Sequence, residues 1–138
     1  MNVDFAFLCD YAEAATSKLS ALGIGFNEIY SPSVPVRHSV FFAVCRFRFT
    51  SAEVGPKALG LRILDADGNS IVPNRDKIIQ VEPPPPGYTE CTHTYAAALY
   101  GVEFPLYGLY AIVFLMGGNE VARLPFRVTQ PPPRPATA

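Results

Sequence analysis

The sequence predicts an all-β fold, an immunoglobulin-like two-sheet sandwich of seven to eight mostly antiparallel strands, with a barrel as the alternative. Three observations favour it. Glycine (10) and proline (14) together account for 24 of the 138 residues, and the apolar segments between them are short. Several of these segments alternate between apolar and polar residues with a period of two. Amphipathic helices are scarce, because only residues 12–22 have a helical composition and Thr16, Ser17 and Ser20 weaken it.

Composition and charge exclude several classes of protein. The chain is 49% hydrophobic and 17% charged, with a formal net charge of -1. A disordered chain is more polar, a membrane protein carries about 18 or more consecutive apolar residues, and a nucleic-acid binder is usually basic. We expect one domain over residues 1–129 and a disordered proline-rich tail over 130–138. Three cysteines and an acidic start without a visible targeting signal predict a cytoplasmic protein with no membrane contact.

The first third of the chain predicts two strands. Residues 3–9 form a compact apolar segment, and residues 10–15 are expected to be one helical turn or a loop. Residues 18–30 read as a second strand, in which Gly23 and Gly25 indicate a bulge or a close approach of backbones.

The middle of the chain shows the clearest alternation. Because successive strand residues point to opposite faces, Cys45, Phe47 and Phe49 fall on a face turned to the core. The intervening Arg46 and Arg48 fall on a solvent-exposed face. After Gly55-Pro56, the apolar residues of 59–63 share a face in the same way. Residues 65–69, Asp-Ala-Asp-Gly-Asn, favour a tight turn into residues 70–72.

The last half predicts a strand, a stiff crossover and a hairpin. A short strand at 77–81 meets the four prolines 83–86, which donate no ladder hydrogen bonds. As an extended polyproline segment they span roughly 12 Å, enough to carry the chain from one sheet to the other. Residues 92–104 resume as a strand, and residues 108–116 and 121–129 form the clearest hairpin around Gly117-Gly118.

The final hairpin supplies the candidate binding surface. If Tyr110 turns inward at the sheet corner, then Ile112, Phe114 and Met116 join the core, as do Ala122, Leu124, Phe126 and Val128 on the next strand. Alternation then leaves an outward apolar stripe flanked by a basic strand, and Pro125 marks an edge or a bulge. This interface consists of Ala111, Val113, Leu115, Arg123 and Arg127. Either another part of the chain, such as residues 11–21 or the proline-rich segments, covers the stripe, or it contacts a protein partner or a second copy. If it is such a contact, Val113→Glu is expected to reduce association without unfolding the domain.

An ordered set of short motifs resembles a known group. Cys9-Asp10-Tyr11-Ala12, Lys18-Leu19 and Leu22-Gly23-Ile24-Gly25 precede strands with Asp-x-Asp-Gly and a closing Gly-x-Tyr strand and hairpin. This order is similar to that of a family of uncharacterised bacterial proteins that resemble small immunoglobulin-like β-sandwiches. The resemblance covers most of residues 3–129 and implies the fold, with no known activity or catalytic residues.

Reactive constellations are sparse, so we expect no catalytic residues, cofactor or metal. Residues 65–69 have the carboxylates of a calcium loop, but glycine comes fourth and Asp76 stands at position twelve, so a hairpin turn is the better interpretation. Cys91 and His93 share a strand face, yet they form one short-spaced pair where zinc needs more ligands. Whether the Cys91 thiol is reactive stays open.

The arginines raise the alternative of weak single-stranded nucleic-acid binding, because Arg46 and Arg48 could track phosphates as Arg123 and Arg127 could. The net charge opposes it, and the sandwich would split the patch. The expected function is a non-enzymatic protein-binding or structural module. A small enzyme with a loop-borne site is the other alternative, and the proline tail is a further candidate ligand for an aromatic-lined groove.

Overall fold

A computed structural model describes residues 1–15 and 18–133 of the chain, and it is all-β. The sandwich class predicted from the sequence is confirmed, with ten strands in place of seven to eight. The immunoglobulin-like arrangement is compatible with the strand order below and stays a prediction. The strands are β1 (Asn2–Cys9), β2 (Tyr11–Ala15), β3 (Lys18–Leu22), β4 (Glu28–Tyr30), β5 (Val36–Thr50), β6 (Gly55–Leu64), β7 (Arg75–Val81), β8 (Glu90–Phe104), β9 (Gly108–Met116) and β10 (Asn119–Thr129), with one 3₁₀ turn, η1 (Ser51–Glu53).

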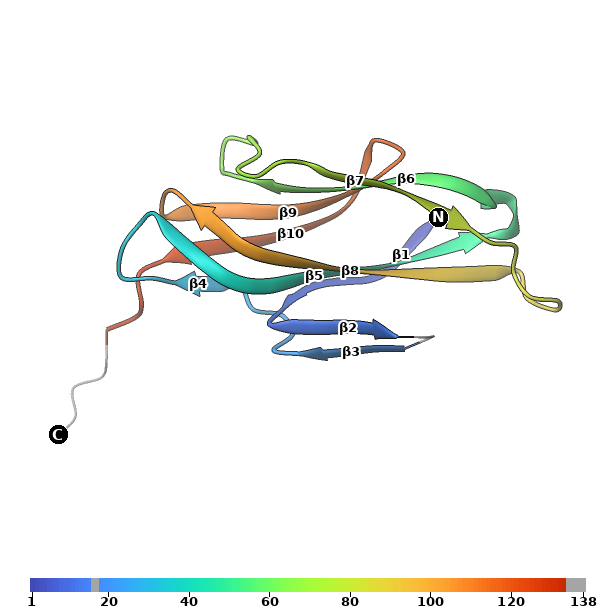
Figure 1. The fold of residues 1–138 in the computed structure, drawn as a ribbon, viewed down its shortest axis with the longest axis horizontal. Coiled ribbons are helices and arrows are strands. Elements are labelled where there is room, and N and C mark those ends of the chain that lie inside the picture. Colours follow the sequence, from blue (N-terminus) through green and yellow to red (C-terminus); the bar gives the residue numbers. More distant parts are fainter. Residues whose placement is uncertain (16–17, 134–138) are drawn as a thin grey trace.

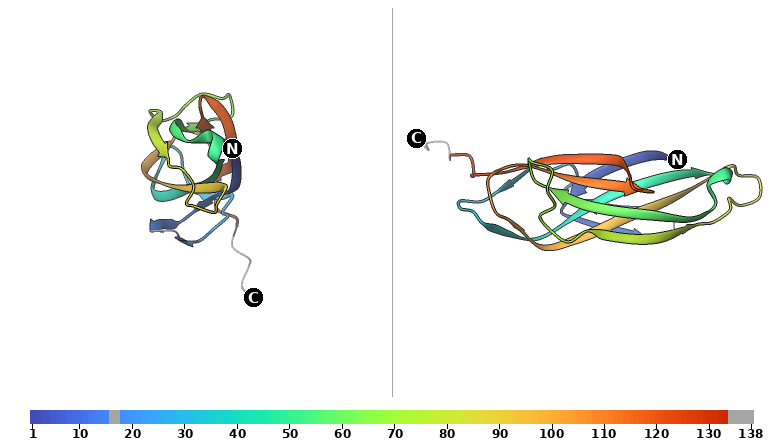
Figure 2. Two further views of the ribbon diagram at one scale, coloured as in Figure 1. Left: turned by 90° about the vertical axis from the view of Figure 1, so that its right-hand side faces the viewer. Right: turned by 90° about the horizontal axis from the view of Figure 1, so that it is seen from above.

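Two sheets form the body of the sandwich. One has three strands in the order β1-β5-β8, and the other has five in the order β4-β10-β9-β6-β7. All pairings are antiparallel except the short one between β10 and β4. Figure 1 shows the two sheets as stacked layers of an elongated molecule, and the end-on view in Figure 2 shows the space between them.

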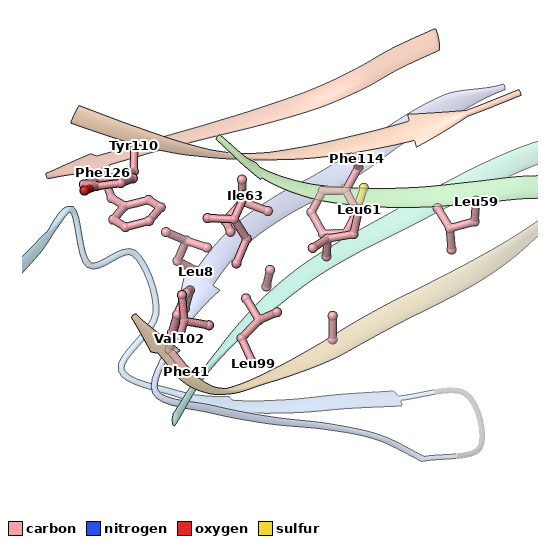
Figure 3. Close-up of a cluster of buried hydrophobic side chains, with 14 of the residues drawn as sticks. Leu8, Phe41, Leu59, Leu61, Ile63, Leu99, Val102, Tyr110, Phe114 and Phe126 are labelled. Atoms are coloured by element: carbon pink, nitrogen blue, oxygen red, sulfur yellow. The ribbon is translucent and has the colours of Figure 1, made fainter. Parts of the chain in front are cut away.

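The main core fills this space, and the alternation predicted from the sequence places the side chains there (Figure 3). Phe47 and Phe49 of β5 face the five-stranded sheet, and their neighbours Arg46 and Arg48 face away from it. β6 contributes Leu59, Leu61 and Ile63, and β9 and β10 contribute Tyr110, Ile112, Phe114, Met116, Phe126 and Val128. Both sheets therefore bury one face against the other.

A third layer covers the opposite face of the three-stranded sheet. The two-stranded hairpin β2-β3 lies beneath β5 and β8 in Figure 1, where Ala12 packs in a second apolar cluster with Phe42 and Val44. The expectation of a helical turn or loop at residues 10–15 is therefore wrong. The single strand expected over 18–30 is divided into β3 and β4, because Gly23 (φ 67°) and Gly25 (φ 85°) turn the chain between them.

Four connections carry the chain directly between the two main sheets, and two of them are prominent in the sequence. Residues 82–89 contain the four prolines, include no strand, and link β7 of the larger sheet to β8 of the smaller one, as the sequence predicts. Residues 105–107 return the chain to β9, and Tyr110 secures this corner. Its hydroxyl donates to the Leu106 carbonyl (2.7 Å) and accepts from the Leu106 N–H (3.3 Å). Tyr110 is buried, as predicted.

Charged side chains and a proline lie at the open edges of the sheets. β8 is an edge strand, and the Arg75 guanidinium donates to its Ala98 carbonyl (2.7 Å). The Lys77 ammonium lies 4.3 Å from the centroid of the Tyr95 ring on the same strand. On β10, Pro125 has no N–H to offer. Charged side chains and proline at edges oppose strand addition, so the broad faces are the better surfaces for contact.

Candidate protein-binding face

The outer face of the five-stranded sheet carries the residues predicted as an interface. Ala111, Val113 and Leu115 alternate with the core residues of β9 and so lie on the face turned away from the core. Arg123 and Arg127 of β10 are exposed. Exposure along the stripe is uneven, however, because Ala111 is 7% and Val113 only 2% exposed, whereas Leu115 is half-buried.

Neighbours on the same face explain why the middle of the stripe is buried. Val113 lies in register between Arg62 of β6 and Arg123 of β10, and the aliphatic parts of long arginine side chains cover such small residues. Ala111 lies between Leu64 and Pro125 in the same way. The register thus indicates cover from adjacent strands of the sheet, and the hairpin residues Ala12, Leu19 and Ala21 pack against the three-stranded sheet instead.

The open apolar surface lies to one side of this stripe. A hollow of about 340 Å³ is formed over β6, β7 and the end of β9. Its apolar lining includes Ala58, Gly60, Ile78 and Leu115. Ile78 is 68% exposed although it belongs to a regular strand. We call this surface, with the Arg62–Asp76 pair at its margin, the outer-face hollow.

Gly60 lets the margin of the hollow form. Arg62 Nη1 and Asp76 Oδ1 are 2.9 Å apart across β6 and β7. A Cβ added at Gly60 would lie 2.8 Å from Asp76 Oδ1, 3.2 Å from Arg62 Nη1 and 3.4 Å from the Leu115 Cβ. The separations from Asp76 and Arg62 are shorter than ordinary packing allows, so the absence of a side chain at residue 60 leaves room for the ion pair over the sheet.

Charges around the hollow are paired on the same face. Besides the Arg62–Asp76 pair, Arg123 Nη2 lies 2.7 Å from Glu120 Oε1, and this contact raises the pKa of Arg123 above its usual value. Exposed ion pairs of this kind contribute little to stability. They do leave the face with cations and carboxylates interspersed.

The arginines considered for nucleic-acid binding are divided between opposite sides of the molecule. Arg46 and Arg48 lie on the three-stranded sheet, where Arg48 Nη2 is 2.7 Å and Arg46 Nε is 3.3 Å from Asp4 Oδ2. Arg123 and Arg127 lie on the five-stranded sheet. The split expected from the sandwich is therefore present, and most of these cations already face carboxylates.

Cys91 and His93 lie on the inner side of β8, beside a cavity of about 350 Å³ below the proline segment. The Cys91 thiol donates to the Glu82 carbonyl at 3.4 Å. Burial, followed by the nearby Lys77 charge, lowers the pKa of His93.

The thiol of Cys45 on β5 lies in the core, where burial raises its pKa to about 12. Within residues 1–15 and 18–133, no three His, Cys, Asp or Glu side chains come together as metal ligands.

In the predicted turn at residues 65–69, the carboxylate of Asp65 accepts hydrogen bonds from the backbone of the turn itself. Asp65 Oδ1 accepts hydrogen bonds from the backbone N–H groups of Asp67 (3.0 Å) and Asn69 (2.9 Å). Leu64 and Ser70 then form a single antiparallel bridge. This is the geometry of a turn closed by a side chain, and it confirms the tight turn predicted for residues 65–69.

The sequence missed Ile78 and Gly60 as members of the candidate site. A signal for Ile78 was present, because the adjacent pair Ile78-Ile79 in a strand must turn one isoleucine outward. Gly60 gave no signal of its own, since its role depends on Asp76 in the neighbouring strand.

Comparisons with known proteins place the whole sandwich in one group. The profile of a family whose function is unknown matches residues 4–129. No curated protein matches the chain. Among the residues that the structure describes, no helix is long and apolar enough to cross a membrane.

Proposed function

The chain belongs to DUF6941, a family of unknown function, and we propose that it is a non-enzymatic protein-binding module. The outer-face hollow is the binding surface, and the occupant is a second copy of the same chain. A different protein that uses the same surface is the alternative. We further propose that the protein acts in the cytoplasm.

The exposure of Ile78 is the observation that carries the proposal. An isoleucine turned to solvent leaves most of its apolar surface in water, whereas burying such a side chain in a contact contributes about 1.5–3 kcal/mol. Ala58 and Leu115 extend the apolar area beside it. Apolar centres with a charged margin are typical of protein contacts.

Charge balance favours a second copy. Arg62 and Asp76 form one pair on this face, and Arg123 and Glu120 form another. A twofold axis brings the same surface against itself, so a face of one sign would repel its copy. A face with both signs can align cations of one copy with carboxylates of the other.

The test is the mass of the protein in solution, measured by light scattering across a concentration series. Ile78→Glu is expected to shift the protein towards the monomer. Two isoleucines are lost per dimer, so the association constant falls by at least about a hundredfold, corresponding to about 3 kcal/mol.

Leu22→Glu is the matched control, because Leu22 is 69% exposed and lies on the hairpin β2-β3, away from the hollow. It is expected to leave the mass unchanged. A monomer at all concentrations for the unmutated protein contradicts self-association. If Ile78→Glu then also fails to reduce capture of a partner, the binding role of the hollow is wrong as well.

A further inference from the structure

Another cavity lies between the hairpin β2-β3 and the three-stranded sheet, on the side of the molecule where Figure 1 shows the hairpin beneath β5 and β8. Its volume is about 420 Å³, within the range of small-molecule sites. It is lined by Ala14 and Ala15 of β2, Lys18 of β3, Arg46 of β5, and Thr92, His93 and Thr94 of β8. Ala14 lies on its hairpin side. The outer-face hollow, by contrast, lies on the other sheet.

Hydrogen-bond donors converge on this cavity. Arg46 Nη2 donates to Thr92 Oγ1 at 3.2 Å. The Thr92 oxygen therefore acts as an acceptor, and its own hydroxyl hydrogen remains available to donate. Thr94 stands directly opposite Arg46 in the β5–β8 register. A ligand in the cavity thus meets one guanidinium and two threonine hydroxyls.

The charges beside the cavity do not cancel. Asp4 is held mainly by Arg48, which donates to it from Nε (2.9 Å) and Nη2 (2.7 Å), and Arg48 also pairs with Glu90 at 3.3 Å. Arg46 has only the longer contact to Asp4, and its buried Nε makes no hydrogen bond within the described residues. Lys18 has no ion-pair partner among those residues. Among the described residues, the two cations that line the cavity, Lys18 and Arg46, thus have a single carboxylate contact between them, at 3.3 Å.

We propose that this cavity binds a small organic anion. The anionic group, a phosphate or a carboxylate, is held by Lys18, Arg46 and the threonine hydroxyls, because charge-assisted hydrogen bonds are the strongest available there. A short apolar part of the ligand rests against the methyl group of Ala14. The cavity's donors and surplus positive charge select an anion over a neutral molecule of the same shape.

The test is an NMR titration of the full chain with three small probes of similar size: ethyl phosphate, propionate and the uncharged propionamide. Saturable shifts of the Lys18, Thr92 and Thr94 amides are expected with at least one anion and not with propionamide. Saturation by ethyl phosphate alone assigns a phosphate ligand, and by propionate alone a carboxylate. Saturation by both shows that charge decides binding.

Variants separate a specific site from general charge attraction. Lys18→Gln is expected to weaken anion binding roughly tenfold, since one charged hydrogen bond is lost, and Thr94→Val is expected to weaken it several-fold without a change in charge. Lys57→Gln, on the other sheet, makes the same charge change and is expected to have less than about a twofold effect. The proposal is overturned if neither anion saturates, if propionamide binds equally well, or if Lys18→Gln and Lys57→Gln act alike.

Discussion

The corner at Tyr110 allows the effect of one hydroxyl on stability to be predicted. Tyr110→Phe removes the donated bond to the Leu106 carbonyl (2.7 Å) and the accepted bond from the Leu106 N–H (3.3 Å). The ring contacts remain, because the ring of Phe104 lies 5.0 Å and that of Phe126 5.9 Å away between centroids. The variant therefore isolates the hydrogen bonds from the packing.

The expected loss follows from these two bonds. A hydrogen bond contributes a net 0.5–1.5 kcal/mol, and the Leu106 backbone groups are only partly buried, so water replaces some of what is lost. We expect the free energy of unfolding to fall by about 1–2 kcal/mol, and the thermal midpoint by roughly 3–6 °C for a domain of this size.

Urea unfolding followed by circular dichroism measures the change, since the chain has no tryptophan to report by fluorescence. Tyr100→Phe is the control, because Tyr100 is 69% exposed and makes no side-chain hydrogen bond among the described residues. Its effect should stay below about 0.5 kcal/mol. Equal losses for the two variants would refute the idea that the hydroxyl of Tyr110 stabilises the crossing between the sheets.

Three more outcomes are expected. Iodoacetamide at neutral pH should label at most Cys91 in the folded protein, because Cys9 and Cys45 are buried and their pKa values are raised; labelling of all three without denaturant would contradict this structure. The pKa of Glu53 is lowered from 4.5 to about 2 by the N-terminal ammonium and the Thr50 N–H, so its contribution to stability is present above pH 4.5 and disappears as the pH falls towards 2. Urea titrations at several pH values should show that the difference in unfolding free energy between wild type and Glu53→Gln shrinks as the pH falls from 4.5 towards 2. A difference that stays constant would refute this role of the Glu53 carboxylate. Gly60→Ala should displace the exposed Asp76 carboxylate and weaken self-association in light scattering, while calorimetry shows a midpoint change below about 3 °C; a much larger drop would mean that the ion pair cannot move.

Strands with strict alternation could be predicted from the sequence, and strands with helical composition could not. Phe47 and Phe49 fall on one face because every second residue of β5 does. β2 contains Ala12, Ala14 and Ala15, residues with high helix propensity. It becomes a strand because small side chains let the hairpin lie close to Phe42 on the neighbouring sheet, which is a tertiary contact that no local pattern contains.

The candidate site was predictable in its location and not in its detail. Alternation correctly assigned Val113 and Leu115 to the outer face. Their exposure depends on what stands beside them, and the register that brings Arg62 next to Val113 joins residues distant in the chain. Because Val113 is buried, Val113→Glu confounds association with stability, and Ile78→Glu is the better probe of this face.

The hairpin β2-β3 covers part of the outer face of the three-stranded sheet, whereas no further layer covers the outer face of the five-stranded sheet among the described residues. In the proposed dimer, two molecules related by a twofold axis bury the outer faces of both five-stranded sheets against each other. Self-association of this kind would form a closed pair and would not continue into a fibre.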